Sequence, residues 1–92
     1  MKIRITIELW KEGDLYVTRS PELDMAAQGY SVEMAKKNLL EVIGIQFEEM
    51  KYLGTLDDFL SQAGYQLEEG EILSEKEIIG FEKSFVELER VG

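Results

Sequence analysis

Residues 28–53 read QGYSVEMAKKNLLEVIGIQFEEMKYL, and this stretch decides the fold. Its spacing places one set of side chains on a single side of an α-helix, because the set recurs every three to four residues. The set consists of Val32, Ala35, Leu39, Val42 or Ile43, Gln46 or Phe47, Met50 and Leu53. Ser31 is suited to cap the first turn, and Gly54 is suited to end the last. We therefore predict one long amphipathic helix whose apolar side needs a partner surface.

Gly44 lies in the middle of this predicted helix. Glycine inside a helix costs about 1 kcal/mol relative to alanine. We therefore expect Gly44 to allow another backbone or side chain to approach closely.

Three strands are predicted before this helix. Residues 2–10 alternate between apolar and polar side chains, which is the pattern of a strand with one buried face. Residues 15–19 follow a turn at Gly13 and return as the second strand of a hairpin. Pro21 interrupts the pattern because proline lacks a backbone donor, and residues 23–28 resume as a third strand.

The length of the hairpin loop leaves two registers open. A three-residue loop would put Leu15 and Val17 on the face that carries the isoleucines of the first strand. A two-residue loop would put Tyr16 and Thr18 there instead.

A second, short helix is predicted after Gly54. Thr55, followed three residues later by Asp58, is typical of a helix amino terminus, and Gly64 is suited to end the helix. The inward side of this helix would consist of Leu56, Phe59, Leu60 and Ala63.

The last third of the chain is acidic and less regular. Residues 68–77 contain five glutamates and one lysine, which indicates a solvated loop. Residues 78–91 fit two structures, and we predict a strand because of their β-branched and aromatic content. The alternative is a helix with one apolar face formed by Ile78, Phe81, Phe85 and Leu88.

Together these elements predict an α+β fold. It comprises a three-stranded antiparallel β-meander, a long helix packed on one face, a short second helix and a C-terminal strand. We expect a single domain over residues 1–92, with a βββα core at 1–54 and an acidic helix–loop–strand extension at 55–92. A chain of this size buries a small core, so a homodimer or higher homo-oligomer is expected.

The composition excludes most familiar active sites. The chain has no cysteine and no histidine, which removes thiolate nucleophiles, imidazole catalysis and the usual ligands of zinc. It has no glycine-rich phosphate loop and no calcium-loop spacing. We therefore expect no enzyme activity, no metal and no cofactor. Since no stretch is long and apolar enough for a membrane span or a secretion signal, a cytoplasmic location is expected.

The formal net charge of −9 is unevenly distributed. Residues 1–20 carry four cations and three anions, whereas residues 55–92 carry three cations and ten anions. Such a surface repels nucleic acid, whose binding depends on Lys and Arg. A basic protein is the more suitable partner.

Two sets of residues are candidates for function. A carboxylate nuclease with two magnesium ions would have to use Glu8, Asp14, Asp24 and Glu41, but their spacing forms no specific motif. Partner binding has better candidates in the aromatic pair Trp10 and Tyr16 near the hairpin end and in the acidic cluster. The acidic cluster comprises Glu68, Glu69, Glu71, Glu75 and Glu77.

Five segments in the first half of the chain carry a family resemblance. They are IRITIE (3–8), EGDLYV (12–17), SPEL (20–23), AQGYSVEMA (27–35) and NLLE (38–41). In this order they resemble the HicB-like antitoxin family. Residues 24–26, Asp-Met-Ala, depart from the small residues that the family usually has before Gln-Gly.

The resemblance implies a truncated RNase H-like fold in a small oligomeric protein. Family members neutralise small basic HicA-type toxins, which cleave RNA, by covering the active surface of the toxin. Complete family members often add a DNA-binding module, but residues 55–92 are too acidic to resemble one. The resemblance therefore implies toxin binding and leaves DNA binding doubtful. The alternatives are a solitary oligomeric interaction protein and a residual magnesium-dependent nuclease.

Overall fold

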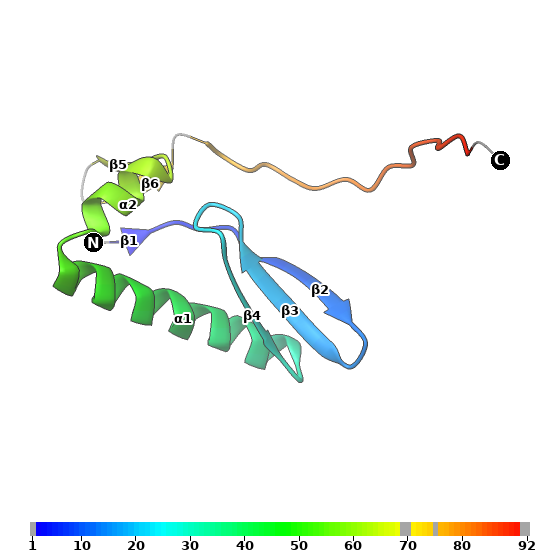
Figure 1. Ribbon diagram of the computed structural model, residues 1–92, viewed down its shortest axis with the longest axis horizontal. Helices are drawn as coiled ribbons and strands as arrows, with labels where there is room; N and C mark the ends of the chain where they lie inside the picture. The colour runs from blue at the N-terminus through cyan, green and yellow to red at the C-terminus, as the bar shows by residue number, and fades with distance from the viewer. Residues whose placement is uncertain (1, 69–70, 75, 91–92) are drawn as a thin grey trace.

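The computed structural model describes residues 2–68, 71–74 and 76–90, which form an α+β fold as predicted. Figure 1 shows two small sheets with a long helix alongside them. In chain order the elements are β1 (Lys2–Ile3), β2 (Glu8–Glu12), β3 (Leu15–Ser20), β4 (Met25–Gly29), α1 (Val32–Leu53), α2 (Leu56–Gln62), β5 (Tyr65–Glu68) and β6 (Glu71–Ser74).

The predicted antiparallel meander is the sheet β2–β3–β4. Glu12 pairs with Leu15, which leaves a two-residue loop in which Gly13 has a φ of 58°. Of the two registers, the two-residue loop is therefore the observed one. It places Thr18 opposite Leu9 and on the side of the sheet that faces α1, where Thr18 is fully buried.

The long helix α1 packs on one face of this sheet, against β3 and β4 (Figure 1). Ala35, Leu39 and Ile43 are buried, as their spacing predicted. The Ser31 hydroxyl accepts a hydrogen bond from the Met34 backbone N–H at 3.1 Å, and Gly54 ends the helix at a φ of 75°. Both predicted ends of the helix are confirmed.

A buried hydrogen bond ties α1 to the sheet. The Thr18 hydroxyl donates to the Ala35 carbonyl oxygen at 2.8 Å. Helix and strand approach closely at this end, because a Cβ added to Gly29 would lie 2.8 Å from the Ala35 nitrogen. The start of α1 can therefore pack this closely on β4 only because Gly29 has no side chain.

Gly44 does not have the role that we expected. A Cβ placed on it meets no heavy atom of the described residues within 4 Å, and the residue lies on the exposed side of α1. The expectation of a close approach was therefore wrong.

We expect Gly44→Ala to raise the free energy of unfolding by about 0.5–1 kcal/mol, since alanine loses less backbone entropy on folding and has open space here. Urea denaturation followed by circular dichroism measures the change. Gly54→Ala is the matched control, because the left-handed conformation at Gly54 strains alanine and should lower stability. A Gly44→Ala protein less stable than the parent would contradict this reading of α1.

The short helix α2 follows as predicted, with a different start. Leu60 is buried, and Leu56, Phe59 and Ala63 pack partly buried against the core. Thr55, however, makes no side-chain cap; its hydroxyl contacts the Met50 carbonyl oxygen at 3.4 Å. The predicted capping role of Thr55 was wrong, because its hydroxyl is directed back to the end of α1.

A second sheet, β1–β6–β5, was not predicted. The expected solvated loop at 68–77 was wrong, since β5 and β6 form an antiparallel hairpin there. The predicted strand 2–10 is split into β1 and β2, and β1 pairs in parallel with β6. The two sheets share one core, in which Leu23 and Leu39 from the first half cluster with Leu60 and Tyr65 from the second.

A strand does follow α2 toward the C-terminus, but it is β6 (Glu71–Ser74), which lies where we expected a loop. The strand that we placed at 78–91 was wrong for the described residues 76–90, which contain neither helix nor strand. Residue 91 lies outside the described part. No helix among the described residues combines the length and apolarity that crossing a bilayer requires.

Candidate functional site

Residues 76–90, here called the tail segment, are the most unusual surface of the molecule. Figure 1 shows them leaving the two sheets and running away from the body. From residue 79 onward the large apolar side chains are all 66% exposed or more, and they are Ile79, Phe81, Phe85, Val86 and Leu88. Folded monomers rarely present so many apolar side chains in a continuous stretch unless the stretch binds something. The tail segment is therefore the candidate binding element.

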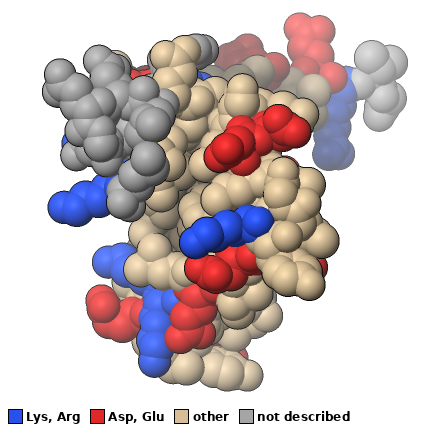
Figure 2. Space-filling model, turned by 90° about the vertical axis from the view of Figure 1, so that its left-hand side faces the viewer, with Lys and Arg blue, Asp and Glu red and all other residues tan. Residues whose placement is uncertain are grey.

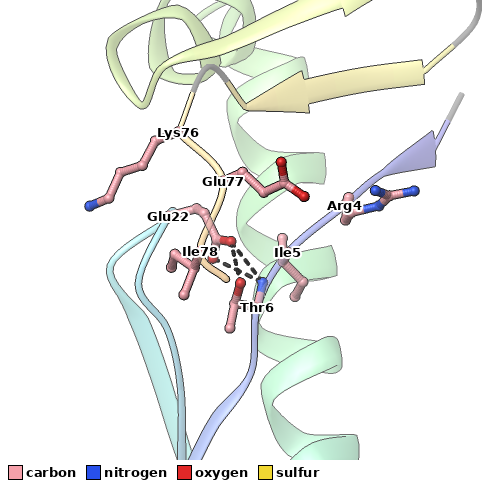
Figure 3. Close-up of a pocket in the computed structure, with 7 residues that line it drawn as sticks. All are labelled: Arg4, Ile5, Thr6, Glu22, Lys76, Glu77 and Ile78. Atoms are coloured by element: carbon pink, nitrogen blue, oxygen red, sulfur yellow. Dashed lines mark hydrogen bonds between the residues drawn. The ribbon is translucent and has the colours of Figure 1, made fainter. Parts of the chain in front are cut away.

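The root of the tail segment crosses the link between β1 and β2. Together they line a cleft of about 240 Å³, whose walls come from residues 4–6, Glu22 and residues 76–78 (Figure 3). Ile78 is half-buried here, whereas every residue from 79 to 90 is exposed. The cleft thus marks the point at which the tail segment leaves the body.

Glu22 lines this cleft and accepts hydrogen bonds from Thr6. Its two carboxylate oxygens each accept the Thr6 backbone N–H at 2.9 Å, and Oε2 also accepts the Thr6 hydroxyl at 2.7 Å (Figure 3). Burial acts to raise the pKa of Glu22, but the hydrogen bonds from Thr6 and a weaker one from Ser20 together hold it below its ordinary value. The charged carboxylate therefore fixes residues 4–7, which no strand pairing fixes.

Tyr65 also holds the link between β1 and β2. It is 5% exposed, and its hydroxyl donates to the Arg4 carbonyl oxygen at 3.0 Å. Burial raises the pKa of the Tyr65 phenol to about 12 from an ordinary 10.0, and the negative charge of Glu22 adds to the shift.

This phenol predicts a loss of stability at high pH. The pKa of Tyr65 is higher in the folded than in the unfolded chain, so its contribution is complete below pH 10 and is lost as the pH rises toward 12. The difference in absorbance at 295 nm between the native chain and Tyr65→Phe should titrate near pH 12. In denaturant the same difference should titrate near 10. Equal midpoints in the two conditions would refute the buried hydrogen bond.

The predicted aromatic pair does not form one surface. Trp10 pairs with Val17 across the strands, whereas Tyr16 pairs with Lys11, so the two aromatic rings belong to opposite faces of the sheet. The Trp10 indole donates to Glu12 at 2.8 Å, and the Lys11 ammonium lies 5.5 Å from the centre of the Tyr16 ring. Trp10, at 38% exposed, is the more accessible of the pair on the face away from α1.

The predicted acidic cluster is only partly placed. Glu68 and Glu71 are opposite each other in the β5–β6 hairpin, and Glu77 lines the cleft. Glu69 and Glu75 lie outside the described residues. Figure 1 places this hairpin where α1 ends, far from the β2–β3 turn, so the acidic and aromatic candidates do not meet. At the end of the molecule shown in Figure 2, Lys and Arg side chains lie among the acidic ones.

The four carboxylates of a conceivable nuclease do not converge. Arg19 bridges two of them, contacting Glu8 at 2.9 Å and Asp24 at 3.0 Å. Asp14 lies in the β2–β3 turn and Glu41 on the exposed side of α1. In residues 2–68, 71–74 and 76–90 there is no group of three or more acidic side chains that could hold a metal ion. These residues therefore give no support to a two-metal site.

Comparison of the chain with family models, with characterised proteins and with solved structures found no match. The functional argument consequently rests on the residues of this chain, and above all on the tail segment.

Proposed function

We propose that this protein is a HicB-like, antitoxin-type binding protein, which neutralises a small basic RNA-cleaving protein by covering its active surface. The observation that carries the proposal is the exposed, apolar tail segment on a chain of net charge −9. The resemblance of the first half of the chain to HicB-like antitoxins points to the same class of partner.

The two features suit two stages of binding. A protein that cleaves RNA needs cationic side chains to hold the phosphate backbone. An acidic protein is attracted to that cationic surface, which raises the rate of encounter and excludes acidic competitors. Exposed aromatic and aliphatic side chains such as Phe81 and Phe85 then supply affinity, since buried apolar anchors dominate most protein interfaces.

The test is co-expression with the small basic protein encoded next to this chain. We expect the basic protein alone to degrade cellular RNA and arrest growth, and this chain to bind it and restore both. A basic protein that leaves RNA intact, or that remains toxic in the presence of well-folded chain, would overturn the proposal. The absence of any small basic protein beside the gene would overturn it as well.

A second candidate, a solitary protein that assembles with copies of itself, is favoured by one observation. Strand β2 is an edge of its sheet, and Leu9 and Trp10 on it are about two-fifths exposed. An edge strand with accessible apolar side chains can pair with another chain. Sedimentation velocity distinguishes this candidate, because it requires a stable oligomer of the pure chain at micromolar concentration.

A further inference from the structure

We propose that residues 79–90 fold into an amphipathic helix on the partner, in an apolar groove bordered by Lys and Arg side chains. This inference rests on the proposed function, and it names the element that binds and the chemistry of the surface that receives it. Ile78, half-buried in the cleft, would stay on the body and fix the point from which the helix starts.

The spacing of the exposed side chains indicates a helix. Phe81, Phe85 and Leu88 occupy positions i, i+4 and i+7, which lie on one side of an α-helix. This is the anchor pattern by which amphipathic helices bind apolar grooves. Each of the three is at least 66% exposed on the isolated chain, so nothing in the described structure already covers them.

In a helix the apolar anchors have one acidic edge. Successive residues turn by about 100°, so Glu82 and Glu89 lie together along one edge of the apolar side, whereas Glu87 lies farther round the helix, one turn from Lys83. Lys83 and Arg90 then lie on the opposite side, away from the groove.

A strand would place Glu82 and Glu89 on opposite faces, so that no acidic edge would form. Lys83 would lie beside Glu87 on one face, and Arg90 would share the other with Glu82. The helix therefore presents apolar anchors with an acidic edge formed by Glu82 and Glu89, and the complementary surface is an apolar groove with a basic border.

The same sequence explains why the segment has no helix on the isolated chain. A helix of about a dozen residues is marginal in water, and Gly80 lowers its stability further. No tertiary contact compensates, since all of residues 79–90 are exposed. Segments of this kind order when they bind.

In a second copy of this chain, the part of α1 around Ile45 and Tyr52 is a poor receiver for the helix. The exposed side of α1 offers Ile45, 66% exposed, and Tyr52, 91% exposed, as apolar contacts. Glu41 and Glu48 recur on that same side of the helix, at spacings of three and four residues from these apolar positions. Glutamates would then oppose the glutamates that flank the helical anchors, and like charges across an interface disfavour it. A basic protein has no such conflict.

The experiment measures the affinity of full-length variants for the small basic protein encoded beside the chain, by calorimetry. Phe85→Ala should weaken binding by about a hundredfold and Leu88→Ala by at least about tenfold, as expected for buried apolar anchors. Ile79→Ala and Val86→Ala are the matched controls. Both side chains are at least 90% exposed, and the helix places them away from the groove, so their affinity should change less than about threefold.

A nuclear magnetic resonance titration of the labelled full chain gives a second readout. Backbone chemical shifts of residues 79–90 should be irregular in the free chain and helical in the complex. A strand that buries the phenylalanines would reverse one pair of results, because Ile79 shares their strand face and Leu88 does not. Loss of affinity with Ile79→Ala but not with Leu88→Ala would therefore overturn the helix.

Two further outcomes would also decide the matter. If the unsubstituted chain binds and neutralises the basic protein while Phe85→Ala and Leu88→Ala bind as tightly, the inference fails and the proposed function stands. If the pure chain is a dimer that Phe85→Ala dissociates, the tail segment binds a second copy and the inference is overturned.

Discussion

Leu39→Ala is expected to lower the free energy of unfolding by about 3 kcal/mol. Among the side chains that the structure describes, Leu39 is the largest that is completely buried, and it lies in the cluster that joins both sheets to α1. The substitution removes the isopropyl group, so the chain loses the free energy gained when that group is transferred from water to the core. It also leaves a cavity that the close-packed neighbours fill only in part. Urea denaturation monitored by circular dichroism and by tryptophan fluorescence measures the loss.

Leu40→Ala is the matched control for this prediction. It removes the same atoms from the next residue of the same helix, where the side chain is 56% exposed. Its effect should remain within about 0.5 kcal/mol, as for most surface substitutions. Equal losses in the two variants would show that the side of α1 that carries Ala35, Leu39 and Ile43 does not face the core.

Glu22→Ala is expected to lower the free energy of unfolding by about 2 kcal/mol. The substitution leaves the backbone N–H and the hydroxyl of Thr6 without the carboxylate that accepts both. Hydrogen bonds to a charged acceptor contribute more than neutral ones, and a donor left unpaired in a partly buried site adds the loss of its solvation. Hydrogen exchange of the Thr6 amide should accelerate even where the whole molecule stays folded.

The same carboxylate predicts an acid dependence. Its pKa is lower in the folded than in the unfolded chain, so its contribution is complete above about pH 4.5 and is lost as the pH falls through the folded value. Glu22→Gln should remove this part of the pH dependence. Glu77→Gln, on the wall of the same cleft, is the control and should keep it. Parallel stability curves for the parent and Glu22→Gln between pH 7 and 3 would contradict the assignment.

Local signals predicted the elements that local interactions determine. The spacing of Ala35, Leu39 and Ile43 and the cap at Ser31 defined α1, because helix periodicity and capping depend on residues within one or two turns. The meander followed from alternation and turn chemistry in the same way. Its register depended on the loop length, which the sequence leaves undetermined until Gly13 is seen to occupy a two-residue turn.

Elements that depend on distant partners could not be predicted in this way. Residues 68–77 look like a loop because their charges indicate solvation, yet β6 gains backbone partners from both β5 and β1. The parallel pairing of Lys2 with Glu71 has no local signature. Alternation over residues 2–10 predicted one strand, but Thr6 turns to Glu22 for its hydrogen bonds and interrupts the ladder.

For the candidate site, too, the local sequence pattern was not sufficient. The sequence places several apolar residues at 78–91, but either a helix or a strand satisfied their pattern, and we did not predict them as a binding site. The structure shows that neither forms on the isolated chain over residues 76–90 and that the side chains from Ile79 onward are uncovered. The role of Glu22 in holding Thr6 at the cleft had no detectable signal, because a Pro-Glu turn commonly carries a solvated carboxylate.

The pairing of β1 with β6 also sets an order of events during folding. These strands are separated by residues 4–70, and closing so long a loop is slow compared with forming the local β2–β3 hairpin or α1. On the ribosome β1 has no partner until residues 71–74 have emerged, whereas the meander and α1 can already pack. The cleft that anchors the tail segment is built on this last pairing. A nascent chain therefore completes the base of the proposed binding element only after the rest of the fold can form.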